Sequence, residues 1–258
     1  MAHPDKLDLA IAAFHEERYD EALRLVLEIH EAAQRRDAAL KPPEFIVQFT
    51  WEQLAERYEP ARAALAGLRD AQAGRLLAGD VETPSRVPGF RQARFGFIAR
   101  LNERLGDARS TYELFLALVE RMPDHAAICA HYALPALIEV GDFALAARHM
   151  PDPLPQLPRL NGLAAEMPLV PPAGAAPRLV AELSNYMNDV RQRAAILEGL
   201  GRSAEAAALR GEALAGIASD EIRQLAWAEL HTPGTFIAAI GNRQATQEGG
   251  RPGAGATD

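Results

Sequence analysis

The chain has 258 residues, of which 48% are hydrophobic and 24% charged, a composition typical of a folded protein and not of a disordered one. Its net charge of -8 opposes nonspecific attraction to nucleic acid and to anionic lipid, so we expect neither nucleic acid nor a membrane as a partner. Cys129 is the only cysteine, which excludes an internal disulfide and suits a reducing compartment. The first ten residues carry acids where a signal peptide needs an apolar run, and we therefore expect a cytoplasmic protein.

Helical periodicity runs through the chain from its first residues. Apolar residues recur at steps of three and four, for example at Leu9, Ala13, Leu23, Val26 and Ile29. Sustained alternation of apolar and polar residues is missing, so no strands are expected. The pattern predicts an all-α protein.

A short phrase recurs in the same register at residues 105–111, 140–146 and 200–206. In each copy a glycine follows the last apolar residue of a helical pattern, and a polar residue beside it precedes the next pattern. Glycine ends a helix at low cost because it adopts the left-handed conformation, and a polar residue caps the following helix. The phrase predicts a helix-turn-helix corner at Gly106, Gly141 and Gly201.

Five residues after each of these glycines stands a small residue, Thr111, Ala146 or Ala206, where two antiparallel helices can cross closely. Two earlier segments have the same form with a glutamate in place of the glycine. Glu17 precedes Ala22 and Glu56 precedes Ala61 by the same five residues, and Pro60 suits the first turn of a helix. We interpret both segments as further corners.

These residues resemble the tetratricopeptide repeat family, most closely over one hairpin. At the spacings of that family's packing residues stand Phe95, Ile98, Ala99, Gly106, Thr111, Phe115, Leu118 and Pro123. The small corner residues are 39, 50, 35 and 60 positions apart, whereas the family repeats every 34 residues. The resemblance implies an irregular stack of antiparallel helix hairpins, a TPR-like α-solenoid, whose groove binds a protein or peptide.

Prolines and a change of composition divide the chain. Residues 1–150 are expected to form TPR-like hairpins, and 151–177 a proline-rich connector that a short helix from Leu160 to Glu166 interrupts. Residues 178–240 are expected to form a C-terminal hairpin and a capping helix. Residues 241–258 lack apolar side chains to bury and are expected to be disordered. A further break, rich in proline and glycine, runs from Gly79 to Phe90.

Signatures of catalysis and of cofactor binding are missing from the sequence. His15 and Glu16 begin like a zinc-protease helix, but Tyr19 stands where the second histidine is required. His125 and Cys129 are four residues apart and could share a soft metal, but a buried thiol is the simpler interpretation. We therefore expect no catalytic residues, no metal site and no cofactor.

A basic segment runs from Pro84 to Arg109 with a local charge of +4, which leaves -12 for the rest of the chain. Arg100 and Arg104 are one helical turn apart and could together bind a carboxylate or phosphate group. Three phenylalanines interleave with the arginines and could add an aromatic contact surface. Alternatively, the aromatics pack inward and the arginines pair with acids of neighbouring hairpins. The segment's charged and aromatic residues are Arg86, Phe90, Arg91, Arg94, Phe95, Phe97, Arg100, Glu103, Arg104, Asp107 and Arg109.

Trp51 and Trp227 are candidate interface anchors, but each also fits the inner face of an amphipathic helix, and we expect both in the core. We expect the function of a noncatalytic adaptor or chaperone-like module for another protein or peptide. If the geometry of the family holds, the binding face contains Arg100, Arg104, His131, Asn188 and Arg191. Because arginine recurs there, we expect an acidic partner segment or one that ends in a carboxylate. A regulatory sensor of a small anionic ligand and an enzyme on a helical scaffold are the alternatives.

Overall fold

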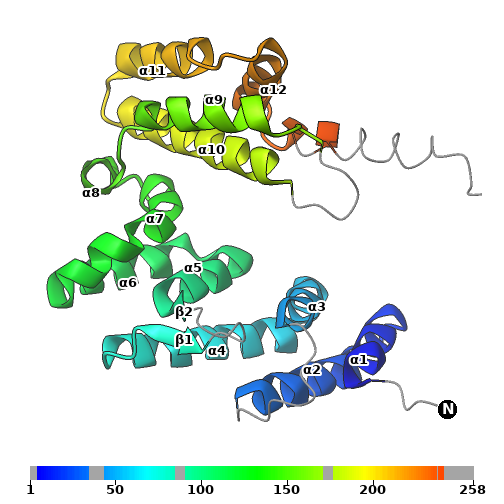
Figure 1. Ribbon diagram of the computed structural model, residues 1–258. Coiled ribbons are helices and arrows are strands. Elements are labelled where there is room, and N and C mark those ends of the chain that lie inside the picture. Colours follow the sequence, from blue (N-terminus) through cyan, green and yellow to red (C-terminus); the bar gives the residue numbers. More distant parts are fainter. Residues whose placement is uncertain (1–4, 35–43, 85–90, 171–176, 237, 241–258) are drawn as a thin grey trace, which may run out of the picture. The chain divides into compact units, whose positions relative to one another are not determined.

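The computed structural model describes residues 5–34, 44–84, 91–170, 177–236 and 238–240. These residues are predominantly helical, as Figure 1 shows, and the all-α prediction is confirmed. The chain divides into two compact units, each with dense contacts within itself: unit 1, Met1–Ala133, and unit 2, Leu134–Asp258. The two units are described one at a time. No helix among the described residues is both long and apolar enough to cross a membrane. The predicted disordered tail, 241–258, lies outside the described residues.

Unit 1 is built from consecutive helices that pack against their neighbours along the chain, α1 on α2, α2 on α3, α3 on α4, α4 on α5 and α5 on α6. Its elements are α1 (Lys6–His15), α2 (Tyr19–Gln34), α3 (Glu44–Arg57), α4 (Glu59–Leu77), β1 (Glu82–Pro84), β2 (Arg91–Ala93), α5 (Arg94–Leu105), α6 (Ala108–Arg121) and the part of α7 (Pro123–Glu139) up to Ala133.

The glycine corners close with one repeated set of backbone bonds. At Gly106 the backbone is left-handed, with φ +66°, and the Asp107 N–H donates to the Asn102 carbonyl at 2.8 Å. The Asp107 carboxylate then accepts from the Ser110 N–H at 3.0 Å and caps α6. Gly141 and Gly201 are also left-handed, with φ +83° and +74°, and the same five-residue closure follows each of them. The three predicted corners are confirmed.

The two glutamate segments behave differently from each other. Glu17 adopts φ +59°, and the Arg18 N–H donates to the Ala13 carbonyl at 2.9 Å, as at the glycine corners. Glu56 instead remains inside α3, and the turn falls at Tyr58, whose backbone is extended. The segment is a corner, as predicted, but the turn falls at Tyr58 and not at Glu56, because α3 runs one residue beyond Glu56 to Arg57.

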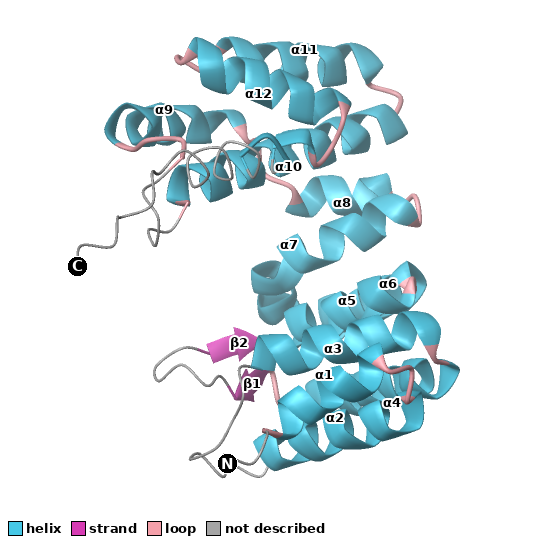
Figure 2. Cartoon of the chain, turned by 90° about the vertical axis from the view of Figure 1, so that its right-hand side faces the viewer, coloured by secondary structure: helices cyan, strands magenta, loops and turns pink. Residues whose placement is uncertain are grey.

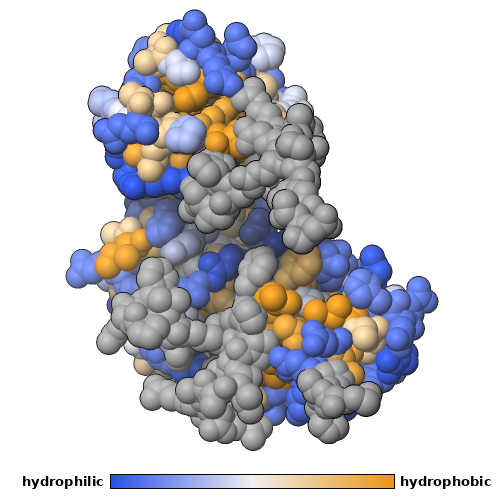
Figure 3. Space-filling model, turned by 45° about the vertical axis from the view of Figure 1, so that its right-hand side comes forward, coloured by the Kyte–Doolittle hydropathy of each residue, from blue (hydrophilic) through white to orange (hydrophobic). Residues whose placement is uncertain are grey.

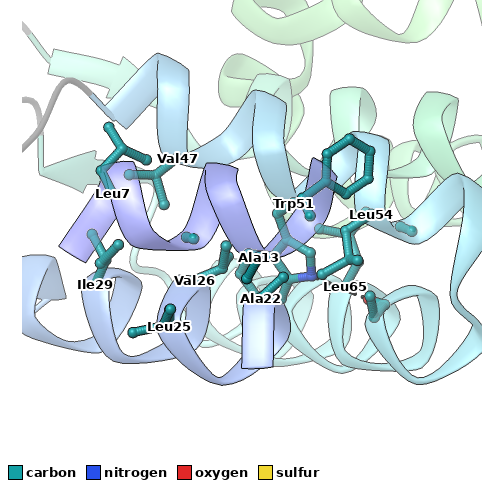
Figure 4. Packing of buried hydrophobic residues seen from close by; sticks show 14 of the residues in the cluster. Leu7, Ala13, Ala22, Leu25, Val26, Ile29, Val47, Trp51, Leu54 and Leu65 are labelled. Carbon is teal, nitrogen blue, oxygen red and sulfur yellow. Dashed lines mark hydrogen bonds between the residues drawn. The ribbon is translucent and has the colours of Figure 1, made fainter. Parts of the chain in front are cut away.

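The small residues of the corners lie at closely packed helix crossings. Ala22, Ala61, Thr111, Ala146 and Ala206 are all buried. Figure 4 shows Ala22 beside Ala13 between the ribbons of α1 and α2, with larger apolar side chains of the same cluster around them. A larger side chain at any of these five positions has to push two helices apart.

A two-stranded hairpin lies where the sequence predicted only a break. Strands β1 and β2 pair antiparallel, with Glu82 opposite Ala93, beside the start of α5 (Figure 2). Buried Arg94 holds this segment: its guanidinium donates to the carbonyl of Asp80 at 2.6 Å and to that of Glu82, and pairs with the Asp80 carboxylate at 2.8 Å. The expectation of no strands is wrong for this segment. Each strand has only three residues, which is too short to show the alternation of apolar and polar residues by which a strand is recognised in a sequence.

Unit 2 is organised around α10 (Arg178–Gly199), against which α8, α9, α11 and α12 pack. Its other elements are α8 (Phe143–His149), the 3-10 turn η1 (Leu154–Gln156), α9 (Leu157–Glu166), α11 (Ser203–Ala215) and α12 (Asp220–His231). The predicted short helix within the proline-rich connector is confirmed as α9. Leu160 of α9 is buried, and the Asn161 side chain bonds to the Gly216 carbonyl at 2.8 Å and to the Ala218 N–H at 2.9 Å. These bonds fasten α9 to the end of α11.

Candidate partner-binding surface

Helix α5 separates its side chains into an inner and an outer face. Ile98, Leu101 and Leu105 are buried in unit 1, whereas Arg100 is partly exposed and Arg104 is exposed. The helix ends at a left-handed glycine, so its register is set by the corner as well as by the apolar face. The structure therefore places the two predicted arginines one turn apart on one helix, as expected from their spacing.

Each arginine has a contact within unit 1. Arg104 Nε lies 3.2 Å from a Glu52 carboxylate oxygen, and the Gln48 amide donates to the other oxygen of Glu52 at 3.1 Å. The Glu52 side chain is only 12% exposed, whereas the Arg104 side chain is 55% exposed. Arg100 donates to the Gln92 side chain when the Gln92 amide oxygen faces the guanidinium. Arg104 therefore pairs with an acid of a neighbouring hairpin, Glu52, and much of its side chain remains in contact with solvent.

Helix α7 adds an aromatic and aliphatic group to unit 1. The rings of His131 and Tyr132 have centroids 3.8 Å apart, and His131 is exposed. The Tyr132 ring lies over Gly96 of α5, where a Cβ atom would come within 2.7 Å of it. Ile128, one turn before His131, is 69% exposed. Sequence reasoning missed Ile128 and Tyr132, although an isolated glycine such as Gly96 inside a helical pattern signals the close approach of another group.

The two phenylalanines of the basic segment that the structure describes, Phe95 and Phe97, do not form an exposed contact surface. Phe95 and Phe97 are buried, and Phe95 packs against Phe115 with ring centroids 5.8 Å apart. The aromatic part of the predicted surface is therefore corrected: the first turn of α5 is buried all round, with Phe95 packed against Phe115 of α6 and Phe97 in the core cluster shared with α1 to α4. Arg86 and Phe90 of the same segment lie outside the described residues.

The other two predicted site residues, Asn188 and Arg191, lie on α10 in unit 2. The Asn188 side-chain oxygen accepts from Arg191 at 2.9 Å, and Arg191 lies 3.7 Å from a Glu229 carboxylate oxygen. Glu229 in turn accepts from the backbone N–H groups of Gly234 and Phe236, at about 3 Å each. The structure brings Asn188 and Arg191 together in a chain of contacts that secures the turn after α12.

Cys129 is an inert thiol in the interior of the protein. Burial raises its pKa to about 11, so the thiol stays protonated at neutral pH. Its Sγ lies 3.3 Å from His125 Nε2, which accounts for the spacing noted in the sequence. Within the described ranges, no group of three His, Cys, Asp or Glu side chains is arranged to hold a metal ion.

The two tryptophans have opposite environments. Trp51 is 3% exposed and donates its indole N–H to the Ala61 carbonyl at 3.1 Å, as a core residue should. Trp227 is 55% exposed and stacks on His231, with ring centroids 4.1 Å apart. The core prediction is therefore wrong for Trp227. Helix α12 directs Ile222 and Ala226 inward, and the residue after Ala226 is rotated about 100° away from them.

Comparison with known proteins leaves the site to be interpreted from its own geometry. No protein-family model, no curated protein and no solved structure matches this chain.

Proposed function

We propose that this chain is a noncatalytic protein-interaction module, an adaptor or chaperone-like protein, that binds an acidic segment of a partner. The segment binds on the α5–α7 surface, defined as Arg100 and Arg104 of α5 with Ile128, His131 and Tyr132 of α7. The observation that carries the proposal is the half-exposed guanidinium of Arg104, held at one nitrogen by the nearly buried carboxylate of Glu52.

This arrangement favours an anionic partner over a cationic one. Two guanidinium groups, those of Arg100 and Arg104, stand on adjacent turns of α5. Glu52 accepts from Gln48 and pairs with Arg104, and the exposed carboxylate of Glu103 lies on the same helix. Fixing Nε to Glu52 reduces the rotamer freedom that Arg104 has to lose when its other nitrogens bind a carboxylate. The basic segment from Pro84 to Arg109, with a charge of +4 in a chain of net charge -8, would steer an acidic segment towards this surface.

The α7 side of the surface supplies apolar contact. Ile128 is exposed beside the stacked rings of His131 and Tyr132, and a partner that covers it would remove its side chain from water. Full burial of such a side chain contributes roughly 1.5–3 kcal/mol to the free energy of binding. Figure 3 shows hydrophobic patches among hydrophilic residues on one face of the molecule. A charged rim beside an apolar contact is the usual composition of a protein interface.

The repeated corners support a TPR-like stack as the scaffold of this surface. The same left-handed closure recurs at Glu17, Gly106 and Gly141, and each joins one helix to the next. In such a stack the first helices of successive hairpins line one face, and α5 and α7 are first helices. An extended segment lying across them would contact both groups of the α5–α7 surface.

The test measures binding of a fluorescein-labelled peptide of twelve residues, rich in Asp and Glu with one central Leu, by fluorescence anisotropy. The double variant Arg100→Glu with Arg104→Glu should bind at least about tenfold more weakly than the unaltered chain, because about 1.4 kcal/mol of charge-assisted contact is enough for that change. The unaltered chain should also lose affinity as salt is raised, and the double variant should lose less.

The matched control reverses two exposed arginines of α6, Arg109 and Arg121, to Glu, which changes the net charge by the same amount. It should bind the peptide nearly as well as the unaltered chain. Equal weakening by both double variants would show that only the total charge matters and would contradict the proposed surface. If glutarate protects the chain against unfolding as strongly as the peptide does, the sensor alternative replaces the adaptor.

A further inference from the structure

A small apolar cavity lies among α2, α3, α4 and α5 of unit 1. Its volume is about 20 Å³, and its walls are the side chains of Val47, Trp51, Leu65, Leu68, Phe97 and Leu101. Figure 4 shows Val47, Trp51 and Leu65 within the packed cluster that surrounds it. A space of this size holds about one water molecule or one methyl group.

The chemistry of the walls favours the methyl group. Among the described residues of the lining, the polar side chains besides Trp51 are those of His30 and Gln48, and the Gln48 amide donates to Glu52. The indole N–H of Trp51 is occupied by the Ala61 carbonyl. A bound water needs two to four polar partners, so an apolar group is the better occupant.

The cavity adjoins the arginines of the α5–α7 surface. Leu101 lines the cavity, and Arg104, three residues later, lies on the part of the exposed face of α5 that borders Leu101. From the opposite side, Gln48 of the cavity wall bonds to Glu52, which pairs with Arg104. A group in the cavity and a carboxylate at Arg104 can therefore belong to neighbouring residues of one peptide.

We propose that the cavity receives the methyl end of a branched aliphatic side chain, Leu, Ile or Val, from the partner's acidic segment. An acidic residue next to this anchor pairs with Arg104. The inference rests on the proposed function and adds a specificity to it: an aromatic ring is too large for the space, and the side chain of Ala ends at Cβ, beside the peptide backbone. The partner is thus an acidic segment with one aliphatic anchor.

Three labelled peptides that differ only in the central residue test the anchor. Each places Leu, Ala or Phe between two Asp residues, and affinity is measured by fluorescence anisotropy. Burial of one methyl-sized group predicts that the Leu peptide binds about fourfold more tightly than the Ala peptide. The Phe peptide should bind no more tightly than the Ala peptide.

Two variants of the cavity should change this order in opposite directions. Val47→Ile adds a methyl group to the space and should abolish the difference between the Leu and Ala peptides while leaving the melting temperature unchanged or raised. Leu68→Ala enlarges the space and should make the Phe peptide bind more tightly than it does to the unaltered chain. Leu116→Ala, on α6 and away from the cavity lining, should leave the order unchanged.

The outcomes separate this inference from the proposed function. If all three peptides bind equally and the charge reversal of Arg100 and Arg104 still weakens them, the anchor is overturned and the acidic-segment surface stands. If Leu is preferred and Val47→Ile leaves that preference intact, the anchor binds elsewhere and the cavity is overturned. If none of the peptides binds, both the proposed function and the anchor fall.

Discussion

Glu17 and Glu56 occupy equivalent places in two similar sequence segments, but the structure predicts opposite effects when each is replaced by glycine. Glu17 has φ +59°, where a side chain costs roughly 1–2 kcal/mol. Glycine removes that cost but loses about 0.5–1 kcal/mol more backbone entropy on folding. Glu17→Gly should therefore stabilise unit 1 by roughly 0.5–1 kcal/mol.

Glu56 is exposed and lies within α3, so it gains nothing from the left-handed freedom of glycine. In a helix, glycine is less favourable than Glu by roughly 0.5–1 kcal/mol. Glu56→Gly should therefore destabilise unit 1 by about that amount. The two substitutions alter charge equally, so the difference between them isolates the backbone conformation.

Urea unfolding followed by circular dichroism at 222 nm measures both effects. With a slope of about 2 kcal/mol per molar urea, the midpoint of the unit 1 transition should rise by roughly 0.3–0.5 M for Glu17→Gly and fall by a similar amount for Glu56→Gly. A fall in midpoint for both variants would refute the reasoning, because it would mean that the corner at Glu17 stores no backbone strain.

Three further predictions concern packing, reactivity and pH. Ala146→Leu should lower the free energy of unfolding, measured by urea titration, by about 1–3 kcal/mol. The control Ala181→Leu, at an exposed position, should change it by less than about 0.5 kcal/mol. Equal effects of the two substitutions would contradict the close helix crossing at Ala146. Cys129, with its pKa raised to about 11 by burial, should react with a thiol reagent at pH 8 only after unfolding, and rapid reaction of the native chain would contradict its burial. Hydrogen bonds from Ser110, and then Arg69, hold the pKa of Asp107 below its usual value, so its contribution to stability is complete above about pH 4 and is lost as pH falls through the lowered pKa. Asp107→Ala should therefore cost about 1–2 kcal/mol at pH 7 and less below pH 4, and an equal cost at both would contradict the role of the charge.

The positions of Arg100 and Arg104 could be predicted from the sequence because both residues belong to one helix. Arg100 and Arg104 were placed correctly on the outer face of α5, since their spacing and the buried Ile98 and Leu101 define that face. Glu52, the acid that holds Arg104, could not be identified from the sequence. An ion pair between residues so far apart in the chain depends on how α3 and α5 meet, and many acids are equally plausible partners.

Local sequence determined the helices and the glycine corners of this protein. The bonds that close a corner join residues at most five apart, so residues 102–110 around Gly106 contain all the groups that this corner needs. The small residues five positions later were likewise readable, because a close crossing requires a small side chain wherever the corner is repeated.

Tertiary packing alone decided which equivalent residues differ in role. Glu17 turns the chain while Glu56 continues a helix, and Trp51 is buried while Trp227 is exposed. The cavity in unit 1 arises where four helices fail to fill the space between them, which no single segment encodes. The physical reason is that hydrogen bonds of caps and turns act over a few residues, whereas burial is set by whichever helices pack across a side chain.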